Sequence, residues 1–291
     1  MRPVNSSKMT VTPAMFSIRR CRVLAASAIL ATGLWAFEIR AADRPHSVVS
    51  EQPQAQKPFT LPGLDLAMVP VPAGTFAMGS PYSESGRNSD EPLHLVTLTR
   101  PFWLGRTPVT EQQYEAVMGN NPAHFKGPDL PVESVSWDEA MLFCRKLTER
   151  ERASGRLPDG YVYTLPTEAQ REYACRAGTS GRYAGELNAI AWFSGNSEEQ
   201  PHPVGQKQPN AWGLYDLQGN VWEWCFDWYG EYPGEKSTDP TGPTKGSARV
   251  YRGGAWFHSA DLCRSAYRYK LAPDERGSLL GFRVALSAVR Q

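Results

Sequence analysis

A short segment from Asp216 to Glu223, with the sequence DLQGNVWE, contains the residue types that calcium prefers. Asp216 and Glu223 supply carboxylates at its two ends, and Gly219 and Val221 can supply backbone carbonyl oxygens between them. Calcium takes oxygen ligands of both kinds from several positions of an irregular loop, and Gly219 permits the sharp turn that such a loop needs. The segment therefore predicts a structural calcium site formed by these four residues. The alternative is a turn held by side-chain hydrogen bonds alone.

The cysteines are the second group of residues that could do chemistry. Cys21 lies near the N-terminus, and the other four are Cys144, Cys175, Cys225 and Cys263. In an oxidising compartment four cysteines allow three complete pairings, and sequence alone does not choose among them. The chain has no CxxC pair and no cluster of cysteines and histidines with zinc-like spacing. We therefore expect no structural zinc.

The first 41 residues are typical of an export signal. Three arginines between positions 19 and 22 form a basic region, residues 23–37 are apolar and uncharged, and Ala41 offers a small residue for cleavage. This order matches a secretory signal, and the apolar run is shorter than the ~20 residues that a membrane span needs. An uncleaved membrane anchor is the alternative. We expect a periplasmic or secreted protein that retains no integral membrane span after signal cleavage.

Composition and charge narrow the class of partner. Of the 291 residues, 41% are hydrophobic and 21% are charged, which is ordinary for a globular protein. The first 41 residues hold six of the 31 Lys and Arg and one of the 30 Asp and Glu, which leaves 25 bases and 29 acids, or about −4, for the remainder. Nucleic-acid-binding domains usually show a basic footprint. We therefore expect no nucleic-acid partner, and a monomer, since no coiled-coil pattern argues for assembly.

For the rest of the chain, the sequence predicts one linker followed by one domain. Residues 42–60 are polar and rich in Pro and Gln, which is typical of a flexible linker. Residues 61–291 follow without a second linker, as a single domain. Hydrophobic patterns predict strands at 67–72, 74–78, 95–98 and 102–104, and helices that begin after Thr110, Ser136 and Thr167. Beyond Gly178, Gly, Pro, Asn, Asp and Trp dominate, so we expect irregular backbone held by aromatic packing.

Several motifs, in this order, resemble the formylglycine-generating enzyme (sulfatase-modifying factor) family. They include MVPVPAGTF at 68–76, LPTEA at 165–169, GLYD at 213–216, GNVWEW at 219–224, RGG at 252–254 and GFR at 281–283. The resemblance covers about residues 64–288. It implies a single α+β domain of low regular secondary structure, related to C-type-lectin-like folds. Family enzymes oxidise a cysteine of a client sulfatase to formylglycine, using oxygen and copper bound by two cysteines.

The resemblance also implies where the active site lies. Cys263, nine residues after Gly254, matches the second active cysteine of the family, whereas His258 stands at the first and Ala255 at a usual serine. One copper-binding thiol is therefore replaced, although imidazole is itself a copper ligand. One hypothesis makes Cys263 and His258 catalytic residues that hold copper. The other makes His258 a hydrogen-bonded cleft residue and Cys263 a disulfide partner, with Cys225 as its candidate mate.

Three further features follow from the same resemblance. The four predicted calcium-binding positions match the family's calcium site, where Asn is common at the position of Asp216. Trp256, Arg252 and Arg264 are candidates to line a substrate cleft, although the aromatic residues of this region are more often core. Arg171 stands where the family usually has a tryptophan.

Two hypotheses about function remain open from the sequence. In the first, the chain is a divergent exported family member, an oxidase or maturation factor that acts on a protein or peptide-derived substrate. In the second, it is a non-catalytic, calcium-stabilised binding or accessory module with a lectin-like cleft. Replacement of one active cysteine favours the second hypothesis, or an enzyme with different chemistry. Retention of Cys263 and of the aromatic cleft keeps the first one open.

Overall fold

The structure is a computed structural model, and it describes residues 56–289. The expected signal at 1–41 and residues 42–55 of the expected linker lie outside the described residues. The first strand begins at Phe59, two residues before the expected start of the domain at Leu61. Within residues 56–289, no helix combines the length and apolar character that crossing a membrane requires.

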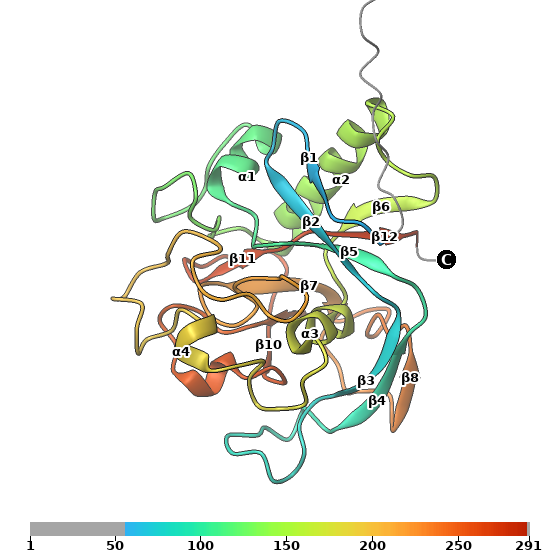
Figure 1. Ribbon diagram of the computed structural model, residues 1–291, viewed down its shortest axis with the longest axis vertical. Helices are drawn as coiled ribbons and strands as arrows, with labels where there is room; N and C mark the ends of the chain where they lie inside the picture. Colours follow the sequence, from blue (N-terminus) through green and yellow to red (C-terminus); the bar gives the residue numbers. More distant parts are fainter. Residues whose placement is uncertain (1–55, 290–291) are drawn as a thin grey trace, which may run out of the picture. The chain divides into compact units, whose positions relative to one another are not determined.

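A five-stranded antiparallel sheet lies at the middle of the domain, in the order β1-β2-β5-β12-β6 (Figure 1). Its strands are β1 (Phe59–Leu61), β2 (Leu66–Val71), β5 (Phe102–Gly105), β12 (Ala285–Ala288) and β6 (Tyr161–Thr164). Successive side chains of a strand point to opposite faces. Trp103 of β5 packs into one core cluster, and its neighbours Phe102 and Leu104 pack into another. Both faces of this sheet are therefore buried.

Two smaller sheets hold the remaining strands. The four-stranded sheet has the order β10-β9-β7-β11, and the three-stranded sheet has the order β3-β4-β8. Their strands are β10 (Arg268–Leu271), β9 (Arg249–Arg252), β7 (Trp222–Trp228), β11 (Leu280–Phe282), β3 (Gly74–Met78), β4 (His94–Leu98) and β8 (Lys236–Thr238). β11 runs parallel to β7, and β8 runs parallel to β4. The four-stranded sheet positions the candidate site, because both segments with predicted chemistry adjoin its strands.

Three helices begin at the residues that the sequence indicated. They are α1 (Glu111–Met118), α2 (Trp137–Ala153) and α3 (Glu168–Arg176), with Thr110, Ser136 and Thr167 as their N-caps. Each has a complete capping box, in which two backbone N–H groups without helical partners are satisfied by side chains. A short α4 (Leu187–Ile190) and a 3₁₀ turn at Ala260–Cys263 follow.

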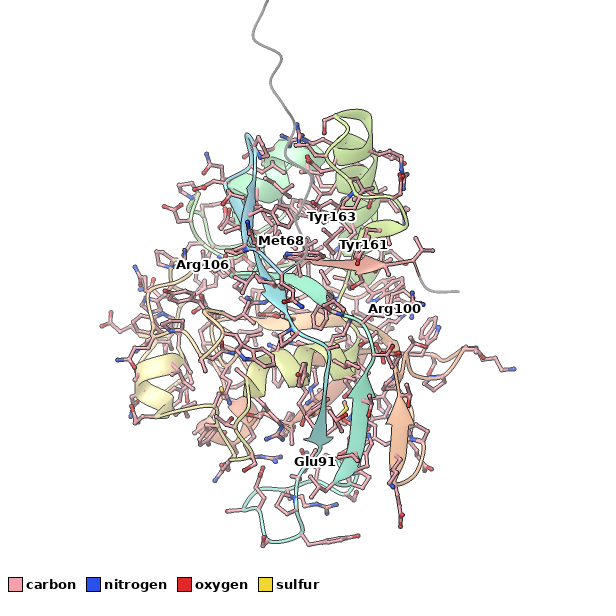
Figure 2. The ribbon with its side chains drawn as sticks, turned by 45° about the vertical axis from the view of Figure 1, so that its right-hand side comes forward. Met68, Glu91, Arg100, Arg106, Tyr161 and Tyr163 are labelled. Carbon is pink, nitrogen blue, oxygen red and sulfur yellow. The ribbon has the colours of Figure 1, made fainter. Side chains whose placement is uncertain are left out.

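The core forms on both sides of the five-stranded sheet. Figure 1 shows α1 and α2 on one side, and α3 with the four-stranded sheet on the other. Met68 and Tyr163, labelled in Figure 2, belong to the cluster that packs with Phe143 and Leu147 of α2. Tyr173 of α3 belongs to the second cluster. The expected α+β fold is confirmed.

The expectation of irregular backbone beyond Gly178 is only partly correct. That region contains six strands, β7 to β12, each three to seven residues long. The longest, WEWCFDW, is buried over most of its length, although its aromatic residues alternate with Glu223, Cys225 and Asp227. Both acids of this strand are buried as well, so the alternation does not separate a core face from a solvent face, and a run this short is hard to assign from sequence.

Candidate functional site

The loop after β9 places Cys263 beneath two glycines. Gly253 and Gly254 both have positive φ, at 111° and 76°, which a residue with a side chain adopts only with strain. A Cβ atom on Gly254 would overlap Sγ of Cys263. The Arg-Gly-Gly motif therefore lets the backbone of the loop lie directly against the cysteine thiol.

The thiol of Cys263 is buried, and burial favours its protonated form. Its side chain is wholly inaccessible and packs with Leu187 and Ala191. Burial raises the pKa of Cys263 to about 12, because the surroundings solvate a thiolate poorly. A cysteine acts as nucleophile or metal ligand through its thiolate. In this conformation Cys263 does not have the properties expected of a catalytic residue.

The disulfide pairing considered from the sequence is wrong for this structure. Cys144, Cys175, Cys225 and Cys263 are all free and buried. Cys225 lies on β7, where burial raises its pKa far above the usual value. Cys175 on α3 lies near the hydroxyl of Ser265, with a distance of 3.9 Å from Sγ to Oγ. All four cysteines therefore pack as small apolar side chains.

His258 faces an indole rather than the thiol. The Nε1–H of Trp222 donates a hydrogen bond to Nδ1 of His258, with 3.1 Å between the nitrogens. Burial lowers the pKa of His258 below its ordinary value of 6.5. Among residues 56–289, no hydrogen bond connects the side chains of His258 and Cys263. The predicted pair is close in sequence, but no hydrogen bond in the described part of the chain joins its two side chains.

This donor set does not fit a copper ion. A copper site needs ligand atoms that converge, and Cu(I) prefers thiolates. Here the expected pair is one thiol and one imidazole, the thiol is wholly buried, and the imidazole Nδ1 already accepts a hydrogen bond. The part of the chain that the structure describes also has no group of three or more His, Cys, Asp or Glu placed to hold a metal ion.

The two arginines expected in the substrate cleft lie instead in the interior. Arg252 is wholly buried, with Nη1 2.8 Å from Oε1 of Glu168 and Nη2 paired with Glu172. Arg264 is 1% exposed and pairs with Glu84 at 2.7 Å and with Glu91 at 2.6 Å. Since each guanidinium is held by two carboxylates, neither presents a charge to a ligand. The expectation that they line a cleft is wrong for this structure.

Sequence reasoning missed the acidic residues that hold these arginines. Glu168 and Glu172 are one turn apart on α3, both are almost fully buried, and Arg176 and Arg268 pair with them as well. Coulombic attraction from Arg268 and Arg252 opposes the effect of burial and lowers the pKa of Glu168. Glu168 and Glu172 are four residues apart within LPTEAQREY, and this spacing on a predicted helix was the sequence pattern that could have indicated the cluster. The cluster joins α3 to the four-stranded sheet.

The Asp216–Glu223 segment is held by arginines. Both carboxylate oxygens of Glu223 accept hydrogen bonds: Arg171 Nε is 3.1 Å from Oε2, and Arg283 Nη2 is 2.8 Å from Oε1. Arg171 also donates to the carbonyl of Leu217 at 2.9 Å, and Arg283 donates to that of Tyr215 at 2.7 Å. Burial and these two cations act on Glu223 together, and the net effect lowers its pKa.

Asp216 has one partnered and one unpartnered oxygen. Oδ2 accepts a hydrogen bond from the backbone N–H of Gly205 at 2.7 Å, and Oδ1 is buried without a hydrogen-bond partner. Burial raises the pKa of Asp216 from 3.8 to about 6. Calcium takes six to eight oxygens, whereas the segment offers one unpartnered carboxylate oxygen beside two fixed cations. The residues present do not fit the predicted calcium ion well.

The exposed part of the site is aromatic. Eight rings form a continuous series, with neighbouring ring centroids 5.1–6.4 Å apart. We call this set the aromatic cluster; it comprises Phe125, Trp222, Tyr251, Trp256, Phe257, His258, Tyr267 and Tyr269. Phe257 is 56% and Tyr269 51% exposed, whereas Trp222 and Trp256 are buried beneath. The cluster thus offers accessible rings on a rigid aromatic base.

Comparisons with known proteins identify the family. A family profile described as sulfatase-modifying factor enzyme 1-like domain matches residues 53–288. The formylglycine-generating enzyme of Streptomyces coelicolor is 30% identical over 79% of this chain and 92% of its own length. Chaperone protein LppX of Paenibacillus barcinonensis is 30% identical over 66% of this chain and 82% of its own. The solved structure of PvdO from Pseudomonas aeruginosa aligns with TM-score 0.72 and 30% identity, covering 81% of this chain and 99% of that one.

Proposed function

Because this chain belongs to the sulfatase-modifying factor enzyme 1-like family, we propose that it is an exported accessory protein that binds a protein or peptide segment on the aromatic cluster. Binding in this proposal needs neither a thiolate nor a copper ion. The burial of the Cys263 thiol and the lowering of the pKa of His258 by burial are consistent with that role.

The observation that carries the proposal is the exposure of Phe257 and Tyr269 above buried aromatic neighbours. Large aromatic side chains dominate binding energy in protein interfaces because they bury much apolar area at little entropic cost. Trp222 packs against Tyr251 with ring centroids 5.1 Å apart, and Tyr251 packs against Tyr269 at 5.5 Å. Packing against Tyr251 therefore restrains Tyr269, which lowers the entropy lost on binding.

Similarity to LppX also favours an accessory role. That relative is named a chaperone protein, and it matches 66% of this chain at 30% identity. An aromatic surface that holds a segment of a client protein suits such a role. On this basis the ligand is a protein or peptide rather than a metabolite.

A second candidate function is that of an oxidase or maturation factor. It is favoured by 30% identity to a formylglycine-generating enzyme over most of both chains and by retention of Cys263 at the matching position. For this chemistry Cys263 would have to become accessible and ionised. That would require rearrangement of the 253–263 loop, since the glycine backbone covers the thiol.

Binding to an array of peptides tests the first candidate. Peptides retained by the wild-type protein are measured again by fluorescence polarisation with Phe257→Ala and Tyr269→Ala, and with Lys270→Ala as an exposed non-aromatic control. We expect each aromatic variant to weaken binding about tenfold or more, as removal of an interface anchor does, and the control to bind as the wild type does. Equal binding by all four proteins would refute the proposal. Oxygen-dependent oxidation of a cysteine peptide would establish the second candidate instead.

A further inference from the structure

We propose that the guanidinium of Arg171 takes the place of a calcium ion in the Asp216–Glu223 segment, so that this protein folds and keeps its loop ordered without metal. The proposal does not depend on the proposed function, although Trp222 of the aromatic cluster lies within the same segment.

The first argument is the set of atoms that the arginines bind. Calcium stabilises an irregular loop by binding carboxylate and carbonyl oxygens at once. Arg171 also binds one carboxylate oxygen and one carbonyl oxygen, through hydrogen bonds to Oε2 of Glu223 and to Leu217, which is not among the four predicted calcium ligands. Arg283 contacts Glu223 and the carbonyl of Tyr215. Together the two arginines hold the carbonyls on either side of Asp216 and the carboxylate at the end of the segment.

The second argument is charge. Asp216, Glu223, Arg171 and Arg283 are all almost fully buried, and their formal charges sum to zero when both acids are ionised. A calcium ion added to this set would leave two uncompensated positive charges in the interior, which is costly. Without Arg171 the same set would carry one net negative charge, and a divalent cation would be better accommodated.

The third argument is that the backbone leaves room for this side chain. Arg171 reaches the segment past Gly253, where a Cβ atom would overlap Nη2 of Arg171. Gly253 also has φ of 111°, which disfavours other residues. The glycine of the Arg-Gly-Gly motif therefore provides the space through which the guanidinium enters.

Calcium dependence of thermal unfolding tests the proposal. The wild-type protein is desalted, its calcium content is measured by mass spectrometry, and it is melted in EGTA and in millimolar CaCl₂. We expect no bound calcium and the same melting temperature in both buffers. Stoichiometric calcium, or a lower melting temperature in EGTA, would overturn the proposal.

Variants at Arg171 complete the test. Arg171→Met removes the cation, and Arg171→Gln removes the charge while keeping a donor for Leu217, in case the first variant does not fold. We expect both to lose stability and to recover about 3 °C or more in CaCl₂, by linkage of binding to folding. Arg176→Met, which breaks the buried pair with Glu172 on the same helix, should lose stability without a calcium response. If a folded Arg171 variant has the same melting temperature with and without calcium, the Arg171–Glu223 pair is an ordinary ion pair and the proposal is contradicted.

Discussion

The indole N–H of Trp222 donates a hydrogen bond to Nδ1 of His258 at 3.1 Å. Because an indole nitrogen only donates, Nδ1 must be the acceptor, and in the neutral ring the proton lies on Nε2. The bond joins β7 to the loop after β9 and fixes the orientation of the imidazole. It also opposes protonation of His258, in the same direction as burial.

From this hydrogen bond we predict how removal of the donor changes the pKa and the tautomer of His258. Trp222→Phe keeps an aromatic ring but removes the donor, so Nδ1 becomes free to take a proton. We expect the pKa of His258 to rise from its lowered value toward 6.5, and the Nε2–H tautomer to lose its preference. Nitrogen-15 NMR of the histidine rings measures both quantities, with His124, which is exposed, as an internal reference. An unchanged titration would mean that burial alone sets the pKa.

The burial of Cys263 predicts its reactivity. With a pKa of about 12 and no exposed surface, Cys263 should resist iodoacetamide at pH 7.5 in the native protein. Denaturation without reductant should make all four thiols of residues 56–289 available, since none is in a disulfide. Intact-mass analysis with peptide mapping counts the modified cysteines. Rapid labelling of native Cys263 would contradict the structure and revive the oxidase hypothesis.

The buried carboxyl of Asp216 predicts a dependence of stability on pH. Its pKa is raised from 3.8 to about 6, mainly by burial. Its contribution to stability is therefore fully present below the unfolded value of 3.8 and is lost as pH rises through about 6. Asp216→Asn does not titrate, so its unfolding free energy relative to wild type should increase between pH 4 and pH 7. A shift of about two pKa units corresponds to ~3 kcal/mol.

Urea denaturation of both proteins at several pH values measures this difference. The comparison between pH values matters more than either absolute value, because the substitution also alters the hydrogen bond to Gly205. A difference between the two proteins that stays constant from pH 4 to pH 7 would mean that Asp216 does not titrate in this range.

Arg252 belongs to a buried ion-pair cluster and Arg276 to a surface pair, so we expect their removal to lower the free energy of unfolding by different amounts. Arg252 is wholly buried against Glu168 and Glu172, and Arg252→Met would leave buried carboxylates without this partner. We expect a loss of about 3–5 kcal/mol. Arg276 pairs with Glu139 at the surface, where the two side chains are 50% and 32% exposed. Arg276→Met should cost less than about 1 kcal/mol.

Chemical denaturation of the two variants beside wild type measures both costs. Equal losses would mean that burial does not set the strength of these pairs. A loss near zero for Arg252→Met would indicate that the surrounding carboxylates become protonated or hydrated.

Local sequence was enough to determine several elements. Thr110, Ser136 and Thr167 cap helices as expected, because a capping box depends only on residues three positions apart. The ordered motifs were enough to identify the family. The resemblance also predicts, from the spacing between Gly254 and Cys263, that His258 stands at a position where the family has a thiol.

Tertiary structure decided what these residues can do. Glu223 lies 52 positions from Arg171 and 60 from Arg283, so no local pattern shows that arginines occupy the predicted calcium site. The burial of Cys263 and the pairing of Arg252 likewise depend on segments that are distant in the chain. The physical reason is that pKa, accessibility and net charge at a site are sums over all neighbours in space. Spacing along the chain fixes only the nearest of these neighbours.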